Sequence, residues 1–282
     1  MDAIHIARLP APEGSGVVAS RRFPGVFWAQ QDSGRGDRTM LWAFKVEAGQ
    51  ITPLRDGQIF VPFPIWSGGI INHDWEDIAI SGSHDPAGKG VIHIGDFGNN
   101  GLRRRNLEIQ RVAEPNPYID TSAGLLSTKK ISYPREGMPA RLISYNAEAM
   151  LTAAGREYVI AKKAPAPHLY KVGEGREMVM EGLLGTPKGG WGQRRVTAAD
   201  RSRDRKRIVV TVHGGDFYVY AHGGSADLSL GLLAPPRWAG VYVRAGQRSQ
   251  VEAVAFVGDS YDLLFLSESG SVTFLPAAGY GG

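Results

Sequence analysis

Cysteine is absent from the 282 residues of the chain, which excludes disulfides, thiolate zinc sites and thiol nucleophiles. Long apolar runs are absent as well, because no segment reaches the roughly 18 apolar residues that a membrane-spanning helix needs. The first ten residues, MDAIHIARLP, lack the apolar core of a signal peptide. We therefore expect no membrane span. The location is left open between export, which is slightly favoured, and the cytosol.

Several catalytic motifs are missing too. The sequence contains no GxSxG elbow, HExxH pair, Walker loop or dinucleotide fingerprint, and its seven histidines show no metal-ligand spacing. The net charge of +4 is far milder than that of a typical nucleic-acid binder, so no nucleic-acid polymer is expected as a partner. This mild basic bias favours a small anionic ligand or substrate.

What the sequence has instead is many turns and many short strands. The 37 glycines and 17 prolines are spread along the chain rather than gathered in one linker. Alternation of apolar and polar residues, typical of strands, recurs in five segments. These are GVFWAQQ (25–31), GVIHIGD (90–96), EYVIAKK (157–163), RIVVTVH (207–213) and DLLFLSES (262–269).

A run of small and apolar residues precedes each of these segments, and one or two further strands follow it. The preceding runs start at residues 15, 76, 148, 197 and 252. The expected fourth strands include KKISYP (129–134) and LSLGLL (228–233). Five four-stranded units at this spacing predict an all-β, five-bladed β-propeller that forms one domain over residues 1–282.

The last unit lacks a fourth strand, and AIHIARL (3–9) is an unpaired strand at the other end of the chain. Pairing the two would close the ring and remove its free edges. Two alternatives stay open: a β-sandwich, and a sixth blade, since the second unit is the longest. We expect the propeller to be a monomer.

In a propeller the first strand of each blade lines the central axis, so the first residues of the five runs should face one another. All five carry a side-chain oxygen: Ser15, Glu76, Glu148, Thr197 and Glu252. Three carboxylates around one axis cannot all stay ionised without a neutralising partner. Oxygen ligands without His or Cys select Ca²⁺, or less favourably Mg²⁺.

The alternative is that these acids only accept hydrogen bonds from backbone amides of neighbouring strands. For Asp74 and Asp77, which flank Glu76, turn or supporting hydrogen bonds are the expected role.

The loops after the second strands should open on the same face as this ring and form a funnel. Polar and charged side chains in these loops are candidate ligand-binding residues: Gln31, Asp32, Asp96, Asn99, Arg103, Lys162, Lys163, His213 and Glu268. Lysines and arginines at such a mouth suit a phosphate or carboxylate. For Arg103 a solvated loop position is the alternative, and for His213 a structural role. No catalytic residue is assigned.

Four motifs give the chain a resemblance to known families. DWEDIAI, IGDFGNN, YNAEAM and QVEAVAF resemble a family of largely uncharacterised bacterial propeller proteins. The order hydroxyl–Glu–Glu–hydroxyl–Glu is also similar to that of the calcium-activated nucleotidases, or apyrases. That resemblance implies axial Ca²⁺, hydrolysis of nucleotides, and a phosphate-binding role for Lys162 and Lys163. Thr197 in place of a serine and lysines in place of arginines depart from it.

Three functions follow as hypotheses. The first is a calcium-dependent hydrolase of phosphorylated or nucleotide-like anionic substrates. The second is a non-catalytic, ligand-binding propeller with a structural axial calcium. The third, a glycan-active enzyme, depends on carboxylates whose separations the sequence does not give.

Overall fold

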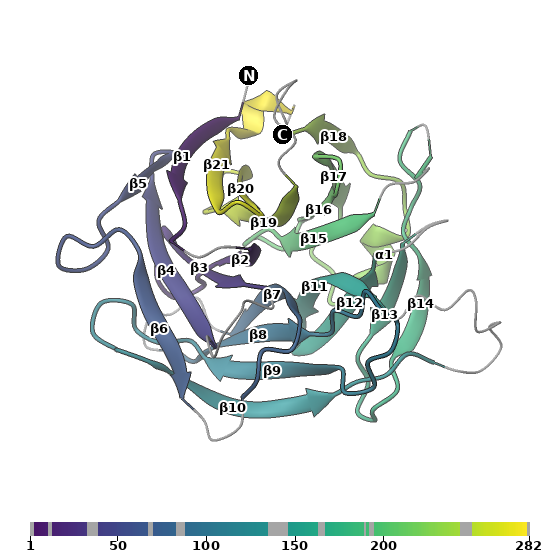
Figure 1. The fold of residues 1–282 in the computed structure, drawn as a ribbon. Coiled ribbons are helices and arrows are strands. Elements are labelled where there is room, and N and C mark those ends of the chain that lie inside the picture. Colours follow the sequence, from purple (N-terminus) through teal and green to yellow (C-terminus); the bar gives the residue numbers. More distant parts are fainter. Residues whose placement is uncertain are drawn as a thin grey trace.

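The chain forms a ring of β-sheets around a central axis (Figure 1). A computed structural model describes residues 3–10, 13–32, 39–66, 70–82, 88–134, 146–162, 167–188, 190–191, 195–242 and 250–280. Within these residues the strands form three four-stranded sheets and one nine-stranded sheet. The nine-stranded sheet divides at one parallel strand pair, and we call its two halves and the other three sheets blades 1 to 5. The predicted all-β propeller is confirmed.

The strands of each blade follow one another from the axis to the rim. Blade 1 contains β2 (Gly14–Ala19), β3 (Val26–Gln31), β4 (Met40–Glu47) and β6 (Val61–Trp66), with the short β5 (Gln50–Thr52) paired to β4. Blade 2 contains β7 (Trp75–Gly82), β8 (Gly90–Asp96), β9 (Glu108–Ala113) and β10 (Ala123–Lys130). Blade 3 contains β11 (Ala147–Ala153), β12 (Arg156–Ala161), β13 (His168–Lys171) and β14 (Val179–Leu183).

The last two blades follow the same order. Blade 4 contains β15 (Val196–Arg201), β16 (Arg207–Val212), β17 (Asp216–Ala221) and β18 (Trp238–Val241). Blade 5 contains β19 (Val251–Val257), β20 (Asp262–Ser267), β21 (Ser271–Leu275) and β1 (Ile4–Arg8). The innermost strands β2, β7, β11, β15 and β19 each contact the next around the axis, and β19 contacts β2.

The N-terminal strand closes the ring, as the sequence predicts. β1 pairs antiparallel with β21, with Ile4 opposite Phe274 and Arg8 opposite Ser271. The purple β1 therefore lies beside the yellow β21 in Figure 1. This pairing holds the two ends of the chain in one sheet.

Two segments differ from the expected fourth strands. LSLGLL contains the single helical turn α1 (Ser229–Leu232) rather than a strand. Leu228 and Leu232, four residues apart, are both fully buried, so the helical spacing places them on one side. The fourth strand of blade 2 is β10, which ends at Lys130 and so precedes most of KKISYP. β10 also pairs in parallel with β6 and joins blades 1 and 2 at the rim.

The core lies between adjacent blades, because the first and second strands of each blade bury both faces, whereas the outermost strands are largely exposed. Blades 1 and 5 meet through Phe27 and Phe44 on one side and Leu264 and Leu266 on the other. Burial on both faces explains the continuous apolar runs in second strands such as RIVVTV. No helix among the described residues is long and apolar enough to cross a membrane.

Candidate functional site

Each inner strand enters the sheet through a β-bulge, and the bulge falls on the residue that the sequence singles out. The register skips Ser15, Glu148, Thr197 and Glu252 in blades 1, 3, 4 and 5. In blade 2 it runs from Trp75 opposite Asp96 to Ile78 opposite Ile94, so the skip contains Glu76. A bulge leaves a residue out of the ladder and turns its side chain in a new direction.

A backbone hydrogen bond repeats beside every bulge. The residue two positions before each bulge accepts an N–H from the loop after the second strand, at 2.7–3.1 Å. The pairs are Asp32 to Glu13, Gly98 to Asp74, Lys162 to Asn146, His213 to Arg195, and Glu268 to Gln250. The five positions are therefore structurally equivalent, and the loops after the second strands lie on the same face as the bulges.

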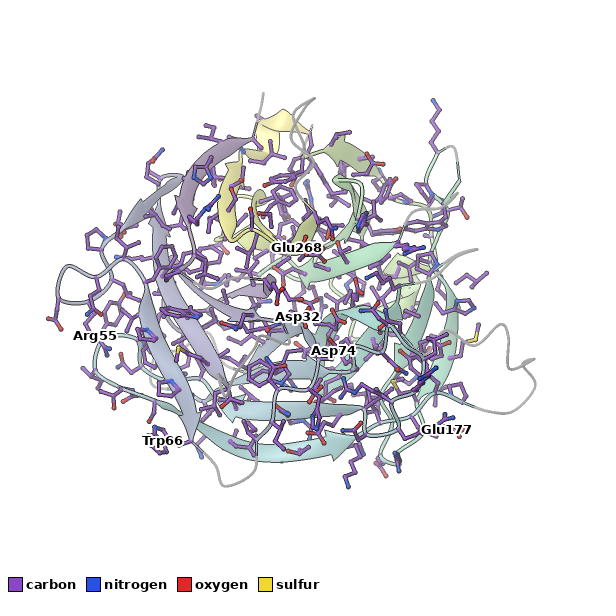
Figure 2. The ribbon with its side chains drawn as sticks, viewed as in Figure 1. Asp32, Arg55, Trp66, Asp74, Glu177 and Glu268 are labelled. Carbon is purple, nitrogen blue, oxygen red and sulfur yellow. The ribbon has the colours of Figure 1, made fainter. Side chains whose placement is uncertain are left out.

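A cavity of about 170 Å³ opens at this end of the axis. We call it the acidic cavity. Its lining comprises Glu13, Gly14, Ser15, Asp32, Glu76, Asn100, Glu148, Lys162, Gln250, Glu252 and Glu268. Six of these residues are acidic and one is a lysine, so the cavity is strongly anionic. In Figure 2 Asp32 and Glu268 lie near the axis, whereas Glu177 lies at the periphery.

Burial and mutual repulsion raise the pKa of three carboxyl groups of the cavity. Burial, with the charges of Glu148, Asp32 and Asp74, raises the pKa of Glu76 well above its ordinary value. Burial raises the pKa of Glu252 to about 8, and the charge of Glu148 adds to this effect. Both follow from removing carboxylates from water next to like charges.

Lys162 is the one basic residue in the part of the lining that the structure describes. Its Nζ donates to Oε1 of Glu148. Burial raises the pKa of Glu148 to about 7 even though the ammonium of Lys162 opposes the rise. Oε2 of the same carboxyl is buried and has no hydrogen-bond partner.

The carboxyl group of Glu76 is held against the loop that follows β8. A Cβ atom at Gly98 would collide with Oε1 of Glu76 and with the carboxyl of Asp74. Glycine at position 98 thus lets the backbone approach both acids closely.

The two hydroxyl residues of the ring behave differently from the acids. Ser15 lines the cavity, and its Oγ donates to the carbonyl of Glu76 at 2.5 Å. Thr197 is not in the lining, and its Oγ1 lies 3.2 Å from Oγ1 of Thr211. The structure therefore gathers four of the five ring residues at one cavity.

Asp77 faces the protein interior rather than the cavity. Its carboxyl accepts the N–H groups of Ile78 at 2.9 Å, Met150 at 2.9 Å and Ala199 at 3.4 Å. It therefore ties together the inner strands of blades 2, 3 and 4. The sequence offers backbone amides as alternative partners for the ring acids. In the structure, Asp77, which is not a ring residue, accepts such hydrogen bonds.

The residues proposed for the mouth separate into two groups. Asp32, Lys162 and Glu268 line the acidic cavity. Gln31, Asp96, Asn99, Arg103 and His213 are not in its lining, and Lys163 lies outside the described residues. Arg103 and His213 are exposed.

Asp96 and Asn99 are buried and already bonded. The carboxyl of Asp96 accepts Arg104 at 2.7 Å and lies 2.9 Å from Nδ1 of His73. Asn99 accepts the N–H of Arg104 at 2.9 Å and donates its own to Asn146 at 2.7 Å. These contacts shape the loop after β8.

The lining includes Glu13 and Gln250, which sequence reasoning did not select. Both occupy the position two residues before a bulge, where Asp74, Asn146 and Arg195 stand in the other blades. Counting back two positions in the sequence from each ring residue identifies these two positions.

The donors of the acidic cavity have the chemistry of a hard-cation site, but they do not converge on one point. Among the residues that the structure describes, no group of three or more His, Asp or Glu side chains is arranged to hold a metal ion. The ammonium of Lys162 lies against Glu148, where an added cation would compete with it. Oε2 of Glu148, which is buried and has no hydrogen-bond partner, is the oxygen best placed to bind a cation.

These features define an all-β propeller with one strongly acidic axial end. No family model matches the chain, and no curated protein matches it. The resemblance to calcium-activated nucleotidases thus gains no support from these comparisons and stays a prediction from the ring residues.

Solved structures with a similar arrangement include two at low identity. Raptor of Chaetomium thermophilum is 10% identical with a TM-score of 0.41; the match covers 96% of this chain and 21% of that one. A structural-genomics target described as a candidate gluconolactonase is 12% identical with a TM-score of 0.43; the match covers 98% of this chain and 92% of that one. The chain thus spans about a fifth of the length of Raptor.

Proposed function

We propose that the acidic cavity captures a hard divalent cation, with Ca²⁺ preferred over Mg²⁺, and that the protein is a ligand-binding propeller organised around this ion. The observation that carries the proposal is the meeting of Glu76, Glu148 and Glu252 at one cavity, where Lys162 is the one basic residue among those described. Three crowded carboxyl groups gain most from a compact, doubly charged partner.

The size and rim of the cavity favour Ca²⁺. A volume of about 170 Å³ holds an ion with several waters, and Asp32 and Glu268 add carboxylates at the rim. Ca²⁺ accepts six to eight oxygen ligands in variable geometry, whereas Mg²⁺ demands a tight octahedron. Glu76, Glu148 and Glu252 would hold the ion, with the Ser15 hydroxyl nearby.

Lys162 acts as the resident counter-charge in this proposal. Its ammonium occupies Oε1 of Glu148, so an incoming ion has to displace it. Since the pKa values of Glu148 and Glu252 are about 7 and about 8, ion uptake at pH 7 also releases protons. Cation binding should therefore tighten as the pH rises from 6 to 9.

Hydrolysis of a phosphorylated or nucleotide-like substrate is the second candidate function. Two carboxyl groups with pKa values near neutrality in one cavity are suited to act as general acid and base. An anionic substrate would need the bound cation, because the lining has six acids against one lysine.

Titration calorimetry with CaCl₂ and MgCl₂ tests the cation site. We expect Ca²⁺ to bind the wild type, Glu148→Gln to weaken binding at least about tenfold, and the peripheral control Glu177→Gln to leave it unchanged. Equal affinities in all three proteins would contradict the proposal.

Phosphate release from ATP, ADP and simple phosphoesters, with and without EGTA, tests hydrolysis. Calcium-dependent release that Glu252→Gln abolishes would support an enzyme. Absence of release, combined with a melting temperature that EGTA lowers, would support a binding protein with a structural ion.

A further inference from the structure

A second cavity lies at the opposite end of the inner strands. It has a volume of about 250 Å³, and we call it the basic cavity. Residues at the start of β2, β7 and β11 line the acidic cavity. Residues at the ends of β7 and β11, and residues just beyond the ends of the inner strands, line the basic cavity. Ser15 and Arg21 are six residues apart along blade 1, which places the two ends on the order of 20 Å apart.

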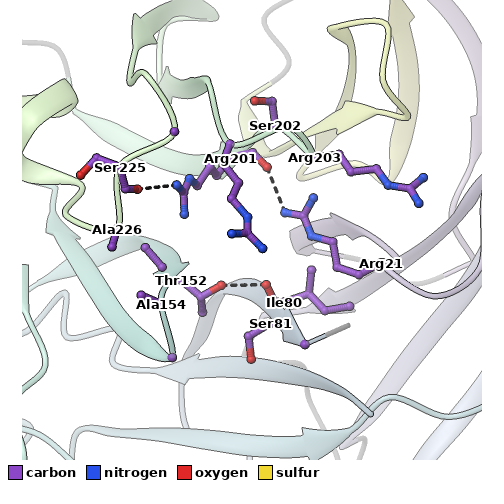
Figure 3. A pocket seen from close by; sticks show the side chains of 15 residues that line it. Arg21, Ile80, Ser81, Thr152, Ala154, Arg201, Ser202, Arg203, Ser225 and Ala226 are labelled. Atoms are coloured by element: carbon purple, nitrogen blue, oxygen red, sulfur yellow. Dashed lines mark hydrogen bonds between the residues drawn. The ribbon is translucent and has the colours of Figure 1, made fainter. Parts of the chain in front are cut away.

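Among the residues that the structure describes, four arginines and no acidic residue line the basic cavity. The lining comprises Arg21, Ile80, Ser81, Gly82, Thr152, Ala153, Ala154, Gly155, Arg201, Ser202, Arg203, Arg205, Gly224, Ser225 and Ala226. Figure 3 shows Arg21 and Arg201 from separate blades on one side of the space, with Ser81 and Thr152 on the other. The charge is thus the reverse of that in the acidic cavity.

Arg201 is buried without a counter-ion. Its side chain belongs to a residue that is only 6% exposed. One Nη donates to the carbonyl of Ser225 at 2.7 Å, and Nε is buried with no hydrogen-bond partner. Among the described residues, no carboxylate oxygen lies within 4.0 Å of the guanidinium of Arg21, Arg201 or Arg205. A buried charge without a partner is costly.

The carboxyl groups whose charges act on these arginines accept hydrogen bonds from other groups. Asp200 accepts the N–H of Phe256 at 2.8 Å, and Glu114 accepts the indole N–H of Trp28 at 3.0 Å. Asp204 accepts the hydroxyl of Ser202 and the N–H of Lys206. Arg203 reaches Asp259 only at 3.9 Å. The charge of Asp200 favours the charged form of Arg21, but none of these contacts places a carboxylate against the guanidinium of Arg21 or Arg201.

The arginines also repel one another. Burial lowers the pKa of Arg201 to about 10, and the charges of Arg205 and Arg21 add to this effect. Burial lowers the pKa of Arg21 as well; the charge of Asp200 opposes this, and those of Arg203 and Arg205 reinforce it. A bound anion would relieve both burial and repulsion.

We propose that the basic cavity is a binding site for a small phosphate-bearing molecule. Guanidinium groups match the oxygens of a phosphate with paired hydrogen bonds, and several of them together favour a dianion over a single negative charge. Apart from Ile80, the rest of the described lining is small or hydroxylated, and it contains no aromatic ring. The ligand class is therefore inorganic phosphate or a small polar phosphate ester, without a base stacked on the protein.

Titration calorimetry with inorganic phosphate in EGTA tests this site. Arg205 and Arg237 are both exposed, but only Arg205 lines the cavity, so Arg237→Gln is the matched control. We expect Arg205→Gln to weaken phosphate binding about tenfold, the loss of one charge-assisted contact, and Arg237→Gln to leave it unchanged. Arg201→Gln should weaken it further, with folding checked by circular dichroism.

Two outcomes would overturn the proposal. One is equal phosphate affinity in the wild type, Arg205→Gln and Arg237→Gln. The other is a rise in melting temperature on addition of phosphate that KCl of the same ionic strength reproduces in full.

The acidic cavity provides an independent comparison. Phosphate binding at the basic cavity should persist in Glu148→Gln and should not need Ca²⁺. Phosphate binding that requires Ca²⁺ and disappears in Glu148→Gln would place the anion at the acidic end and refute the present inference. Failure of Ca²⁺ to bind would leave the phosphate result untouched.

Discussion

The stability of the protein should fall as the pH rises, and Glu252 should be a main cause. The folded pKa of Glu252 is about 8, against an ordinary value of 4.5. A carboxyl group with a raised folded pKa binds its proton more tightly in the folded than in the unfolded state. Its contribution is therefore complete below about pH 4.5 and is lost progressively between about pH 4.5 and 8.

The magnitude follows from the two pKa values. A tenfold change in an ionisation constant corresponds to about 1.4 kcal/mol, so the upper limit is roughly 5 kcal/mol. Glu252 lies partly exposed in a cavity that opens to solvent, and screening by water reduces the effect. We expect Glu252→Gln to raise the free energy of unfolding at pH 8 by about 2 kcal/mol relative to the wild type. At pH 5 the two should differ little.

Urea unfolding in EGTA at pH 5, 6, 7 and 8, followed by tryptophan fluorescence, measures this difference. Trp28 and Trp75 are fully buried and report on the blades near the axis. The double variant of Glu148 and Glu252 to glutamine should show a flatter pH dependence still, since the pKa of Glu148 is also raised, to about 7.

The control is Glu177→Gln, at the periphery (Figure 2). It should keep the pH dependence of the wild type. A Glu252→Gln protein whose stability falls with pH as steeply as that of the wild type would refute the reasoning. So would a wild type that gains stability from pH 5 to pH 8.

Three further results are expected. Lys162→Met removes the ammonium from Glu148, so Ca²⁺ affinity by calorimetry should rise about tenfold; unchanged affinity would show that the lysine does not compete. Asp77→Ala leaves the buried N–H groups of Met150 and Ala199 without their acceptor, so urea unfolding should show a loss of about 2–4 kcal/mol; a loss below about 0.5 kcal/mol would contradict this role. Deletion of residues 1–8 exposes the edge of β21, so light scattering should detect aggregates; a monomer with an unchanged melting temperature would contradict closure by β1.

The two axial ends give the molecule opposite charges along one axis. In the part of the chain that the structure describes, six acids and one lysine line the acidic cavity, whereas four arginines and no acid line the basic cavity. The mild net charge of +4 conceals this separation. The lysines and arginines of the mouth loops predict an anionic ligand at that end, where the described lining consists mostly of carboxylates.

The sequence by itself determined the propeller and the positions of the ring. Strand periodicity and continuous apolar runs recur because the first and second strands of every blade bury both faces in the same way. A bulge recurs at Glu76, Glu148 and Glu252 because each inner strand begins alike. Local patterns that repeat in this way can be recognised without knowing how the blades meet.

Only the tertiary structure decided which side chains meet across blades. Lys162 follows β12 and donates to Glu148. The carboxyl of Asp96 accepts a hydrogen bond from Arg104 and lies against His73. Arg21 and Arg201 are 180 residues apart in the sequence, yet the guanidinium of Arg21 donates to the carbonyl of Arg201 at 3.0 Å. Such meetings depend on closure of the ring and on the reach of long side chains, and neither leaves a periodic trace in the sequence.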